Sequence, residues 1–462
     1  MSSMTIAAVI GGVLLTLLAL GVPVAFALGL TALIATVLFL DAAQFGFFAN
    51  LTFESLNSFS LLAIPLFILM GAVFGQSKAS TDLLEAANAW MGRLRGGLAM
   101  SSVLACSVFA ALTGSSPATS AAIGRIAIPE MLRRGYPNGV ATGAIVAGGT
   151  LGILIPPSVT LILYGIATEQ SIGRLFLGGV GPGILVTVLF CAWIAVAMSL
   201  HRSGRGAGSA AAAEGTGEPS VGGTAGGRTS LATATLDSQL VAWRTRIAML
   251  VKVIPFVLLM AGVLVALYAG IATPSEAAAV GAALAVVLVA VLYRSITVRK
   301  LLDVALETTR TSTMILMIVA FSAVLGQIMS FLGIPQDLAQ AVAEMDVNRW
   351  IVFFAMNVLF LVLGFFIPPV AIILVTMPVL FPIVTQFGFD PIWFGVVMTL
   401  NMEMGLITPP VGLNLYVVQG VAPEVPLRDV LIGSLPYVGV LAVGIVLLIL
   451  FPDVVTWLPD QM

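Results

Sequence analysis

The sequence predicts an all-α polytopic membrane protein built from two inverted repeats. Of its 462 residues, 60% are hydrophobic and only 9% are charged, whereas ordinary soluble domains carry ~25% charged residues. Long apolar segments follow one another along the chain, and a set of short motifs occurs twice in nearly the same spacing. Because a water-soluble surface needs about 25–35% charged residues, this composition excludes a soluble enzyme, a disordered chain and a nucleic-acid-binding protein.

The apolar segments are long enough to enter or cross a bilayer, for which a helix needs ~20 apolar residues. Residues 4–40 are uncharged and predict two helices that separate at Pro23. No basic residue precedes them, so we expect a retained helix and no cleaved signal peptide. Further apolar segments lie near 60–77, 97–115, 117–132, 138–155, 179–200, 248–271, 276–293, 311–332, 350–367, 370–387, 391–407 and 430–451. The amphipathic, mixed-charge stretches 80–94 and 297–310 predict helices lying at the membrane interface.

One stretch, residues 201–243, interrupts this pattern. It is rich in Gly, Ala, Ser and Thr, and such a segment cannot bury enough apolar surface to fold. We therefore expect a flexible linker that joins two halves of similar size.

The two halves share an internal repeat over roughly 72–170 and 323–425. Residues 72–76 (AVFGQ) recur as 323–327 (AVLGQ), at an offset of 251 residues. Further matches at an offset of 253 are Gly152 with Gly405, Pro156-Pro157 with Pro409-Pro410, Pro129 with Pro382, and Gly135 with Gly388. Five short matches at a nearly constant offset indicate a duplicated unit.

Counting spans predicts that the second repeat is inverted relative to the first. If 97–132 and 350–387 each enter and leave on one face, five spans separate the starts of the two repeats, and an odd number reverses the orientation. The count leaves open whether each hairpin crosses the membrane fully twice or turns back midway. Inverted repeats are typical of secondary transporters that work by alternating access.

The distribution of basic residues agrees with this topology. It places 17 of the 19 Lys and Arg residues on one face and only Arg174 and Arg349 on the other. Leaving out the six between 201 and 252, in and beside the long loop, still gives 11 against 2. Because basic residues accumulate on the cytoplasmic side, we expect the linker 201–243 in the cytoplasm and both termini outside.

Four breaks interrupt the apolar segments at membrane depth: 113–120, 152–158, 364–369 and 405–414. Three of them contain a Pro-Pro pair, which cannot continue a helix and removes N–H donors. Unwound backbone survives in a membrane only inside protein or beside a cavity. Its free carbonyl oxygens suit a small hard cation, and the helix N-termini that follow suit an anionic group.

Polar side chains at these breaks are the candidate ligands. Ser115, Ser116 and Thr119 occupy the first break, and Thr408 and Asn414 the fourth. The alternative is that these hydroxyls satisfy their own helix backbone.

Two charged residues within the repeats are further candidates. Glu403 is an intramembrane carboxylate and thus a functional hypothesis by default; it could couple to protons, brace the broken helix or pair with an arginine. Arg125 and Glu130 lie toward the cytoplasmic end of their hairpin arm, where structural pairing is the simpler role.

The histidine and cysteine residues of the chain give little support for a catalytic site. The single histidine, His201, lies in the polar loop, and Cys106 and Cys191 are typical of small buried apolar residues. A serine protease built on the turn 114–116 would lack a base within the membrane. We expect no enzyme activity, no cofactor and no metal site beyond the coupling ion.

Taken together, the motifs resemble a known transporter family. The runs 114–119 (GSSPAT), 128–136 (IPEMLRRGY), 152–158 (GILIPPS) and 405–414 (GLITPPVGLN) are similar to those of the large membrane subunit of tripartite ATP-independent periplasmic (TRAP) transporters. The resemblance covers the whole chain except the linker. Two departures from the family pattern are the long linker and the charge of Arg125 in a hairpin arm.

The resemblance implies a mechanism and partners. It implies a bacterial inner-membrane importer in which two re-entrant hairpins and two broken helices form an elevator-like transport domain. Sodium drives uptake of an organic acid, for instance a C4-dicarboxylate, that a periplasmic substrate-binding protein delivers. A small membrane subunit of about four helices completes the complex within the lipid bilayer.

The resemblance also implies site residues and domain boundaries. The implied sodium ligands are Ser115, Ser116, Thr119, Gly152 and Pro156 in the first repeat, and Gly364, Ile367, Thr408, Gly412 and Asn414 in the second. The implied substrate contacts are Ser116, Pro157, Ser158, Pro369 and Pro410. The transport domain would comprise 60–170 and 323–425; 1–59, 171–200, 244–322 and the C-terminal helix of 426–462 would form the scaffold.

Three alternatives stay open at this stage. A stand-alone sodium–dicarboxylate symporter would have similar hairpins but need no binding protein. A passive channel and an intramembrane protease fit the inverted hairpins and the residue inventory less well.

Overall fold

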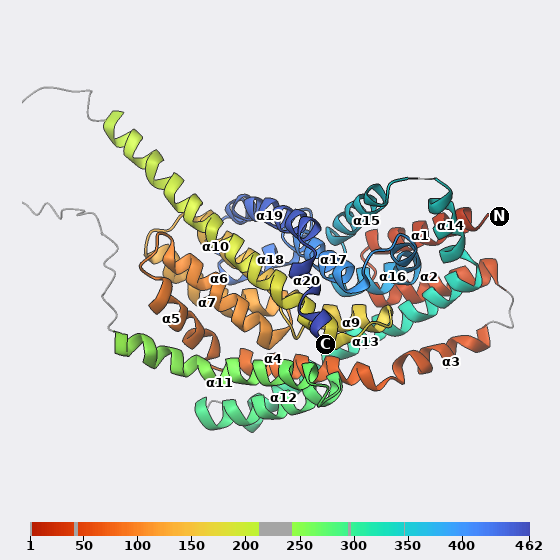
Figure 1. Cartoon of the computed structure of the whole chain (residues 1–462), viewed down its shortest axis with the longest axis horizontal. Helices are drawn as coiled ribbons and strands as arrows, with labels where there is room; N and C mark the ends of the chain where they lie inside the picture. The colour runs from red at the N-terminus through yellow and green to blue at the C-terminus, as the bar shows by residue number, and fades with distance from the viewer. Residues whose placement is uncertain (1, 41–44, 212–242, 294–296, 346) are drawn as a thin grey trace, which may run out of the picture.

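The computed structural model describes residues 2–40, 45–211, 243–293, 297–345 and 347–462. Every regular element in these ranges is helical (Figure 1), which confirms the all-α class. Six of the described helices are long and apolar enough to cross a membrane, or seven if the bent pair Phe48–Leu56 and Phe59–Gly75 forms one span. Most of the expected linker, residues 212–242, lies outside the described residues, as do Arg228 and Arg294 of the basic face.

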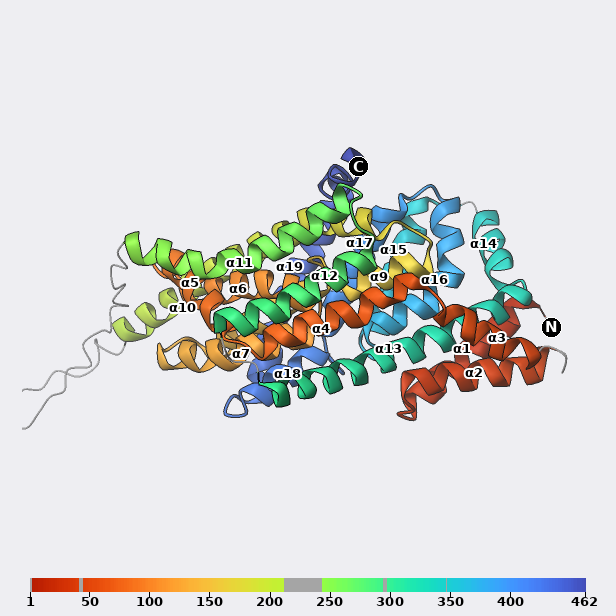
Figure 2. The same cartoon turned by 90° about the horizontal axis from the view of Figure 1, so that it is seen from below.

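The N-terminal helices pair as the sequence predicts. Helix α1 (Ser3–Ala19) ends before Gly21, whose φ of 78° requires glycine, and α2 (Val24–Phe39) starts directly after Pro23. Helix α3 (Phe45–Leu56) and the short η2 (Phe59–Leu62) then lead into α4 (Ala63–Gly75). Figure 2 shows α1, α2 and α3 together at one end of the elongated bundle.

Each repeat begins with a helical hairpin. In the first, α6 (Gly97–Thr113) and α7 (Ser116–Arg133) are joined by a two-residue turn in which Gly114 has a φ of 58°. In the second, α15 (Arg349–Gly364) and α16 (Pro369–Gln386) flank the break at 365–368. The predicted breaks at 113–120 and 364–369 are therefore the hairpin tips.

Each repeat ends with a broken helix. The first consists of α8 (Asn138–Thr150), the 3-10 turn η3 (Leu151–Ile153) and α9 (Val159–Ala167). The second consists of α17 (Pro391–Leu406) and α18 (Leu413–Val421). The Pro pairs that separate the two halves, Pro156-Pro157 and Pro409-Pro410, both have cis peptide bonds.

The broken helix of each repeat packs against the hairpin of the other repeat. Helix α9 of the first broken helix packs against α16 of the second hairpin, while α18 of the second broken helix packs against α7 of the first hairpin. This reciprocal arrangement is what an approximate two-fold axis between the repeats produces. It brings the four breaks toward the centre of the molecule.

Longer helices surround the repeats. They are α10 (Ile172–Ala211), α11 (Trp243–Tyr268), α12 (Pro274–Leu288) with the π-helical η4 (Val289–Tyr293), α13 (Val298–Phe331), α14 (Ile334–Glu344) and α19 (Leu427–Leu450). Short α20 (Asp453–Thr456) and η5 (Pro459–Gln461) follow α19, so the segment 426–462 is three elements where we expected one helix.

Two predicted boundaries differ from the structure. The interfacial stretch 297–310 is not a separate helix, because α13 continues unbroken through Phe331 and no proline interrupts it. Likewise, α10 does not end at residue 200 but runs to Ala211, since Ala- and Gly-containing sequence without proline can extend a helix. Only the stretch 80–94 forms its own amphipathic helix, α5 (Ala79–Met91), which packs against α6.

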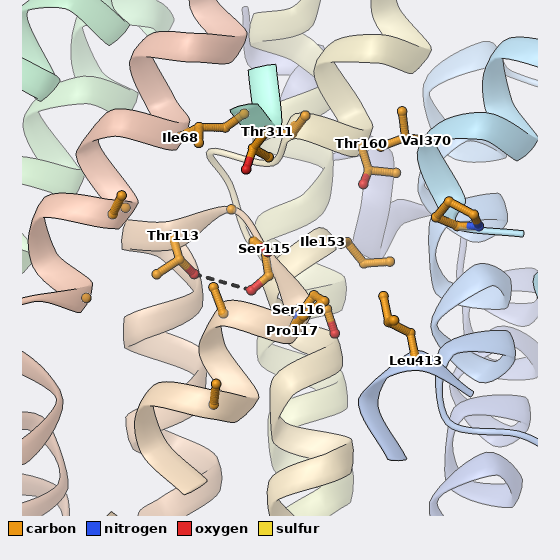
Figure 3. A pocket seen from close by; sticks show the side chains of 18 of the residues that line it. Ile68, Thr113, Ser115, Ser116, Pro117, Ile153, Thr160, Thr311, Val370 and Leu413 are labelled. Carbon is orange, nitrogen blue, oxygen red and sulfur yellow. Dashed lines mark hydrogen bonds between the residues drawn. The ribbon is translucent and has the colours of Figure 1, made fainter. Parts of the chain in front are cut away.

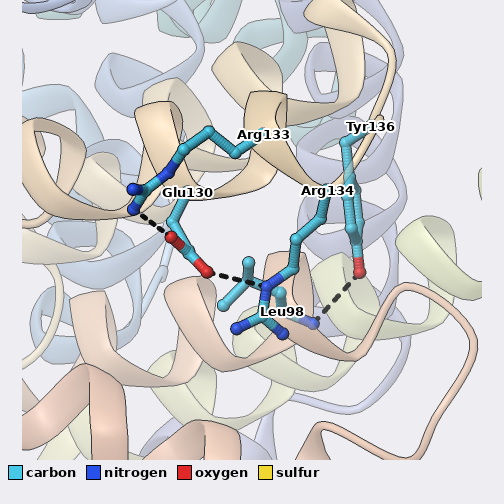
Figure 4. A network of polar contacts seen from close by, with 5 residues as sticks. All are labelled: Leu98, Glu130, Arg133, Arg134 and Tyr136. Carbon is cyan, nitrogen blue, oxygen red and sulfur yellow. Dashed lines mark hydrogen bonds and ion pairs between the residues drawn. The ribbon is translucent and has the colours of Figure 1, made fainter. Parts of the chain in front are cut away.

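A polar network holds the base of the first hairpin (Figure 4). Glu130 near the end of α7 pairs with Arg133, and it accepts a hydrogen bond of 2.8 Å from Nε of Arg134. The hydrogen bond from Arg134, helped by the positive charge of both arginines, holds the pKa of the Glu130 carboxyl below its usual range. Tyr136, just beyond the helix, accepts a hydrogen bond of 3.3 Å at its hydroxyl from the backbone N–H of Leu98. The Glu130 contacts are local to the end of α7, and the Tyr136–Leu98 bond joins that end to the start of α6, opposite the hairpin tip.

Candidate functional site

The tip of the first hairpin lies directly against the first broken helix. A Cβ placed on Gly152 would lie 2.7 Å from the carbonyl oxygen of Ser115, which leaves no room for a side chain. A Cβ on Gly114 would similarly lie 2.7 Å from the carbonyl oxygen of Pro157. The structure thus brings Ser115 and Gly152 together, and the contact depends on glycine at both close approaches.

The second repeat contains a similar backbone contact. A Cβ on Gly405 would lie 2.7 Å from Cα of Gly364, so the second hairpin touches its broken helix at a pair of glycines. Gly405 is the repeat equivalent of Gly152, and it performs the equivalent packing role. Gly412 has a φ of 52°, a left-handed conformation in which L side chains are strained, and begins α18 beside the carbonyl oxygen of Thr408.

A side-chain contact joins the two repeats at the first hairpin tip. The Asn414 amide in α18 donates a 2.6 Å hydrogen bond to the Ser116 hydroxyl and a 3.3 Å bond to the carbonyl oxygen of Val146. Both Ser116 and Asn414 are fully buried, and Oδ1 of Asn414 has no hydrogen-bond partner. A buried amide oxygen without a partner is a costly arrangement, and such an oxygen is also a ligand that a hard cation prefers.

Hydroxyl groups and a carbonyl cluster inside the first hairpin tip. The hydroxyls of Thr113 and Thr119 lie 2.8 Å apart, and that of Thr119 donates to the carbonyl oxygen of Ser115 at 2.9 Å. Figure 3 shows the longer bond, of 3.5 Å, from Thr113 to the same carbonyl. Thr119 therefore satisfies its own helix backbone, as the alternative interpretation allows, while Thr113 joins the cluster from the end of α6.

Two other predicted hydroxyl groups have local partners, and a third predicted position is apolar. The Ser158 hydroxyl donates to the carbonyl oxygen of Ile153 at 2.5 Å and accepts from the N–H of Leu161 at 3.3 Å, so it caps α9. The Thr408 hydroxyl donates to the carbonyl oxygen of Met404 at 2.5 Å. Ile367, at the second hairpin tip, is a buried apolar side chain.

The hairpin tips and broken helices converge on a cavity of about 440 Å³ (Figure 3). The first hairpin lines it with Ser115, Ser116 and Pro117, and the second with Pro369 and Val370. The broken helices contribute Ile153, Thr160, Leu406 and Leu413, while α4 and α13 close the remaining side.

The cavity contains only some of the predicted site residues. Ser115, Ser116, Pro369 and Arg125 line it. The other predicted residues do not: Thr119, Gly152, Pro156, Pro157, Ser158, Gly364, Ile367, Glu403, Thr408, Pro410, Gly412 and Asn414. Most of these lie in the layer behind the lining, where they hold the hairpin tips against the broken helices.

Five polar lining residues were not among the predicted ones: Gln76, Thr113, Thr160, Glu307 and Thr311. Thr311 and Glu307 come from α13, a helix with no break, so no local signal marks them. Gln76 follows α4 within the repeated AVFGQ motif, and this recurrence was the one available indication.

Arg125 is exposed on the cavity side of α7. Glu130, one turn further along α7, pairs with Arg133 and Arg134, and among the described residues no ion pair joins Arg125 to a carboxylate. The structural pairing expected for Arg125 is therefore absent, and its guanidinium is available to an anion. Glu307 on α13 is also exposed and also lines the cavity, so the lining combines one cationic and one anionic side chain.

Glu403 lies outside the cavity, in the buried last turn of α17. It has no exposed surface, and neither carboxylate oxygen has a hydrogen-bond partner. The arginine partner that the sequence left open is not found among the described residues. Two residues earlier, the Asn401 amide donates to the backbone oxygen and to Oδ1 of Asn357, at 2.9 and 2.7 Å, which joins α17 to α15.

Comparison with solved structures supports the architecture. The YdaH transporter of Alcanivorax borkumensis matches 91% of this chain and 90% of its own with a TM-score of 0.59, at 16% identity. MtrF of Neisseria gonorrhoeae matches 88% of this chain and 84% of its own with a TM-score of 0.60, at 14% identity. At these identities the likeness concerns the fold alone.

Curated relatives share much more of the sequence. A C4-dicarboxylate TRAP transporter large permease protein of Pseudomonas aeruginosa is 37% identical over 408 residues, 88% of each chain. An isethionate TRAP transporter permease protein, DctMQ, of Oleidesulfovibrio alaskensis is 34% identical over 88% of this chain and 59% of its own. An ectoine TRAP transporter large permease protein of Halomonas elongata is 32% identical over 87% of this chain and 86% of its own.

The relatives are thus named as permeases of transporters, and their named substrates differ. The family described as "Tripartite ATP-independent periplasmic transporter, DctM component" matches residues 12–454. Together with the helical fold and the repeated breaks, this match over nearly the whole length shows that the chain belongs to the DctM family of TRAP transporter large permeases.

Proposed function

We propose that the chain is the transport subunit of a sodium-coupled importer of a small organic acid. The observation that carries this proposal is the cavity of about 440 Å³ at which both hairpin tips and both broken helices meet. Its lining contains hydroxyl groups and one guanidinium without an ion pair among the described residues, and thus ligands for both a cation and a carboxylate. The family model's tripartite description supports a periplasmic binding protein and a small membrane subunit as partners.

We infer two sodium sites, one at each hairpin tip. The first would use Ser115, Ser116, Thr119, Gly152 and Pro156, and the second Gly364, Ile367, Thr408, Gly412 and Asn414. The ligands of both sites would be backbone carbonyl oxygens and neutral side chains. Such ligands suit sodium, because its single positive charge can be bound by neutral oxygens without a carboxylate. The hydrogen bond from Asn414 to Ser116 would couple the two sites.

The substrate would occupy the cavity between these sites. Ser116 and Pro369 line it directly, the further contacts would come from Pro157, Ser158 and Pro410, and the Arg125 guanidinium would pair with a carboxylate. Of the residues that the structure describes, Arg125 is the one positively charged side chain that lines the cavity, so it would bind one anionic group of the substrate. The substrates named for the relatives include both a C4-dicarboxylate and ectoine. The proposal therefore specifies a small organic acid without naming it.

The moving part in an elevator mechanism would be the two hairpins with the two broken helices. A rigid-body boundary falls between elements, and the expected boundary at 322/323 lies inside the unbroken α13 (Val298–Phe331). We therefore assign α13 to the scaffold as a whole. The cavity then lies between the moving hairpins and the fixed wall of α13, where a substrate would be released as the two parts separate.

Reconstitution tests the proposal. The chain, its small subunit and candidate binding proteins are incorporated in proteoliposomes, and uptake of labelled organic acids is followed with and without an inward sodium gradient. We expect uptake only with both the binding protein and the gradient. Uptake by the chain without a binding protein would favour a stand-alone symporter, and gradient-independent single-channel currents would overturn the proposal.

A further inference from the structure

Thr150 and Glu403 occupy equivalent positions in the two repeats and lie against each other. Thr150 lies two residues before Gly152, and Glu403 lies two residues before Gly405. The two positions are therefore 253 residues apart, the same offset that relates the other matches between the repeats. The Thr150 hydroxyl, which donates a 2.7 Å hydrogen bond to the carbonyl oxygen of Ala147, lies near the Glu403 carboxyl, and η3, which directly follows Thr150, packs against α17. Equivalent residues of two repeats can meet only near the axis that relates them, so Glu403 lies at the pseudo-symmetry axis.

The surroundings of Glu403 are closed to water. Every residue of α17 from Ile392 to Leu406 is buried. Both carboxylate oxygens are inaccessible and without a hydrogen-bond partner. Burying an ionised carboxylate with neither a counter-charge nor hydrogen bonds is prohibitively unfavourable, so the group must hold a cation in this conformation.

The neighbouring helices supply no counter-charge. The described charged side chains on the elements packed against α17 stand at helix ends: Arg174, Arg349, Arg428, Asp429 and Asp453. The remaining ionisable groups there are the phenols and the thiol of Tyr164, Cys191, Tyr416 and Tyr437. Among the described residues, no ion pair or hydrogen bond joins any of these groups to Glu403.

A proton fits this position better than a metal ion. A metal ion here would need several oxygen ligands around it, whereas neither Glu403 oxygen has a hydrogen-bonding neighbour among the described residues. The Thr150 hydroxyl proton is already donated to its own helix, so its oxygen can accept from a neutral carboxyl. A proton needs no coordination sphere and no cavity.

We propose that Glu403 is a proton-binding site whose occupancy is coupled to the second hairpin. The coupling would run through Gly405, which lies two residues beyond Glu403 and touches Gly364 at the hairpin tip. While the hairpin is closed, the carboxyl is sealed from water and retains its proton. When the hairpin moves away from α17, water reaches the carboxyl, the O–H bond breaks, and the proton passes to water while the carboxylate remains.

Proton binding is measurable without any transport. Infrared spectra of the purified protein, compared in H₂O and D₂O at neutral pH, report the carbonyl stretch of protonated carboxylic acids. We expect a deuterium-sensitive band that Glu403→Gln removes and that the matched control Glu424→Gln, at an exposed loop position, leaves unchanged. Absence of the band from the parent protein, or its persistence in Glu403→Gln, would overturn the proposal.

The coupling to transport rests on the proposed function and needs a second measurement. In proteoliposomes with a pH-sensitive dye inside, substrate uptake by the parent protein and by Glu424→Gln should carry protons. Glu403→Gln mimics the protonated state and should still exchange substrate, but without proton movement and without a response to external pH. Unchanged proton movement in Glu403→Gln would disprove the coupling, whereas lack of transport in every variant would count against the proposed function and not against the infrared result.

Discussion

The side chains of Ser116 and Asn414 connect the two repeats by a hydrogen bond of 2.6 Å between fully buried groups. Ser116 begins α7 at the first hairpin tip, and Asn414 lies in the first turn of α18. The bond joins elements that are 298 residues apart in the chain. If the first hairpin tip moves relative to α18, this hydrogen bond must break; if the bond is kept, the two must move together.

We predict that Ser116→Ala and Asn414→Ala act together. Each change leaves a buried polar partner unsatisfied, which costs about 1–3 kcal/mol of stability. A double-mutant cycle on the thermal unfolding of the purified protein should give a coupling energy of roughly 0.5–3 kcal/mol. Sodium should stabilise each single variant less than it stabilises the parent protein.

The control for this pair is Thr142→Val, a buried position whose hydroxyl bonds only to its own helix, at Asn138. Its sodium response should match that of the parent. Additive effects of the two substitutions would mean that the Ser116–Asn414 contact carries no energy.

Alanine at Gly152 or Gly405 should disrupt the packing of the hairpin tips. At both positions a Cβ would lie 2.7 Å from backbone atoms of the facing hairpin, and the backbone cannot yield as a flexible side chain would. We expect a loss of stability of roughly 1–3 kcal/mol from overpacking and a loss of uptake in proteoliposomes.

Gly262→Ala in α11 provides the matched control, because nothing lies within 4 Å of the Cβ it would introduce. There, alanine should raise stability by about 0.5–1 kcal/mol, since glycine destabilises a helix interior relative to alanine. Full activity of Gly152→Ala would contradict the close approach described above.

Replacement of Arg125 by glutamine should weaken substrate binding and leave the fold intact. The side chain is exposed, lines the cavity and has no ion pair among the described residues. A lost charged hydrogen bond to a carboxylate is worth about 1.5–3 kcal/mol, so we expect KM to rise by roughly 10-fold or more. Uptake kinetics over a range of substrate concentrations measure this effect.

Arg95→Gln, another exposed arginine but one that does not line the cavity, should leave KM unchanged. If both variants raise KM equally, the effect comes from the general surface charge. If Arg125→Gln has a normal KM for a carboxylate substrate, Arg125 has no role in binding it.

Glu130 should make the stability of the first hairpin depend on pH. Its hydrogen bond from Arg134 lowers the pKa of the carboxyl in the folded protein. A lowered folded-state pKa contributes stability that is fully present above the unfolded value of about 4.3 and is lost as the pH falls through the folded value. Glu130→Gln should therefore be less stable than the parent near neutral pH.

The difference between the two proteins should shrink as the pH falls below roughly 4, where the parent's carboxyl also becomes protonated. Thermal unfolding in detergent across this range is the measurement. A constant difference at all pH values would show that the Arg134 contact does not depend on the charge of Glu130.

Local sequence patterns determined the helices, the breaks and the repeat. These features follow from residues that are close together in the chain: proline pairs, the length of the apolar segments, and the recurring Gly152 and Gly405. Helix formation depends on the backbone conformations of such neighbouring residues. For the same reason the sequence predicted the hairpin tips and, of the polar residues lining the cavity, Ser115, Ser116 and Arg125. It misplaced the end of α10 and divided α13 near residue 310, where neither proline nor a capping signal stops the helix.

Only the tertiary structure decided which of these residues meet. Nothing local indicates that Asn414 reaches Ser116, that Glu307 and Thr311 of an unbroken helix face the cavity, or that Arg125 lacks the partner that Glu130 finds. Thr150 and Glu403 come together because the repeats are related by an approximate axis, and contacts across such an axis depend on how the whole chain packs. Sequence determines helices through short-range geometry, whereas the charges, oxygens and cavity of the site depend on distances that only the folded chain defines.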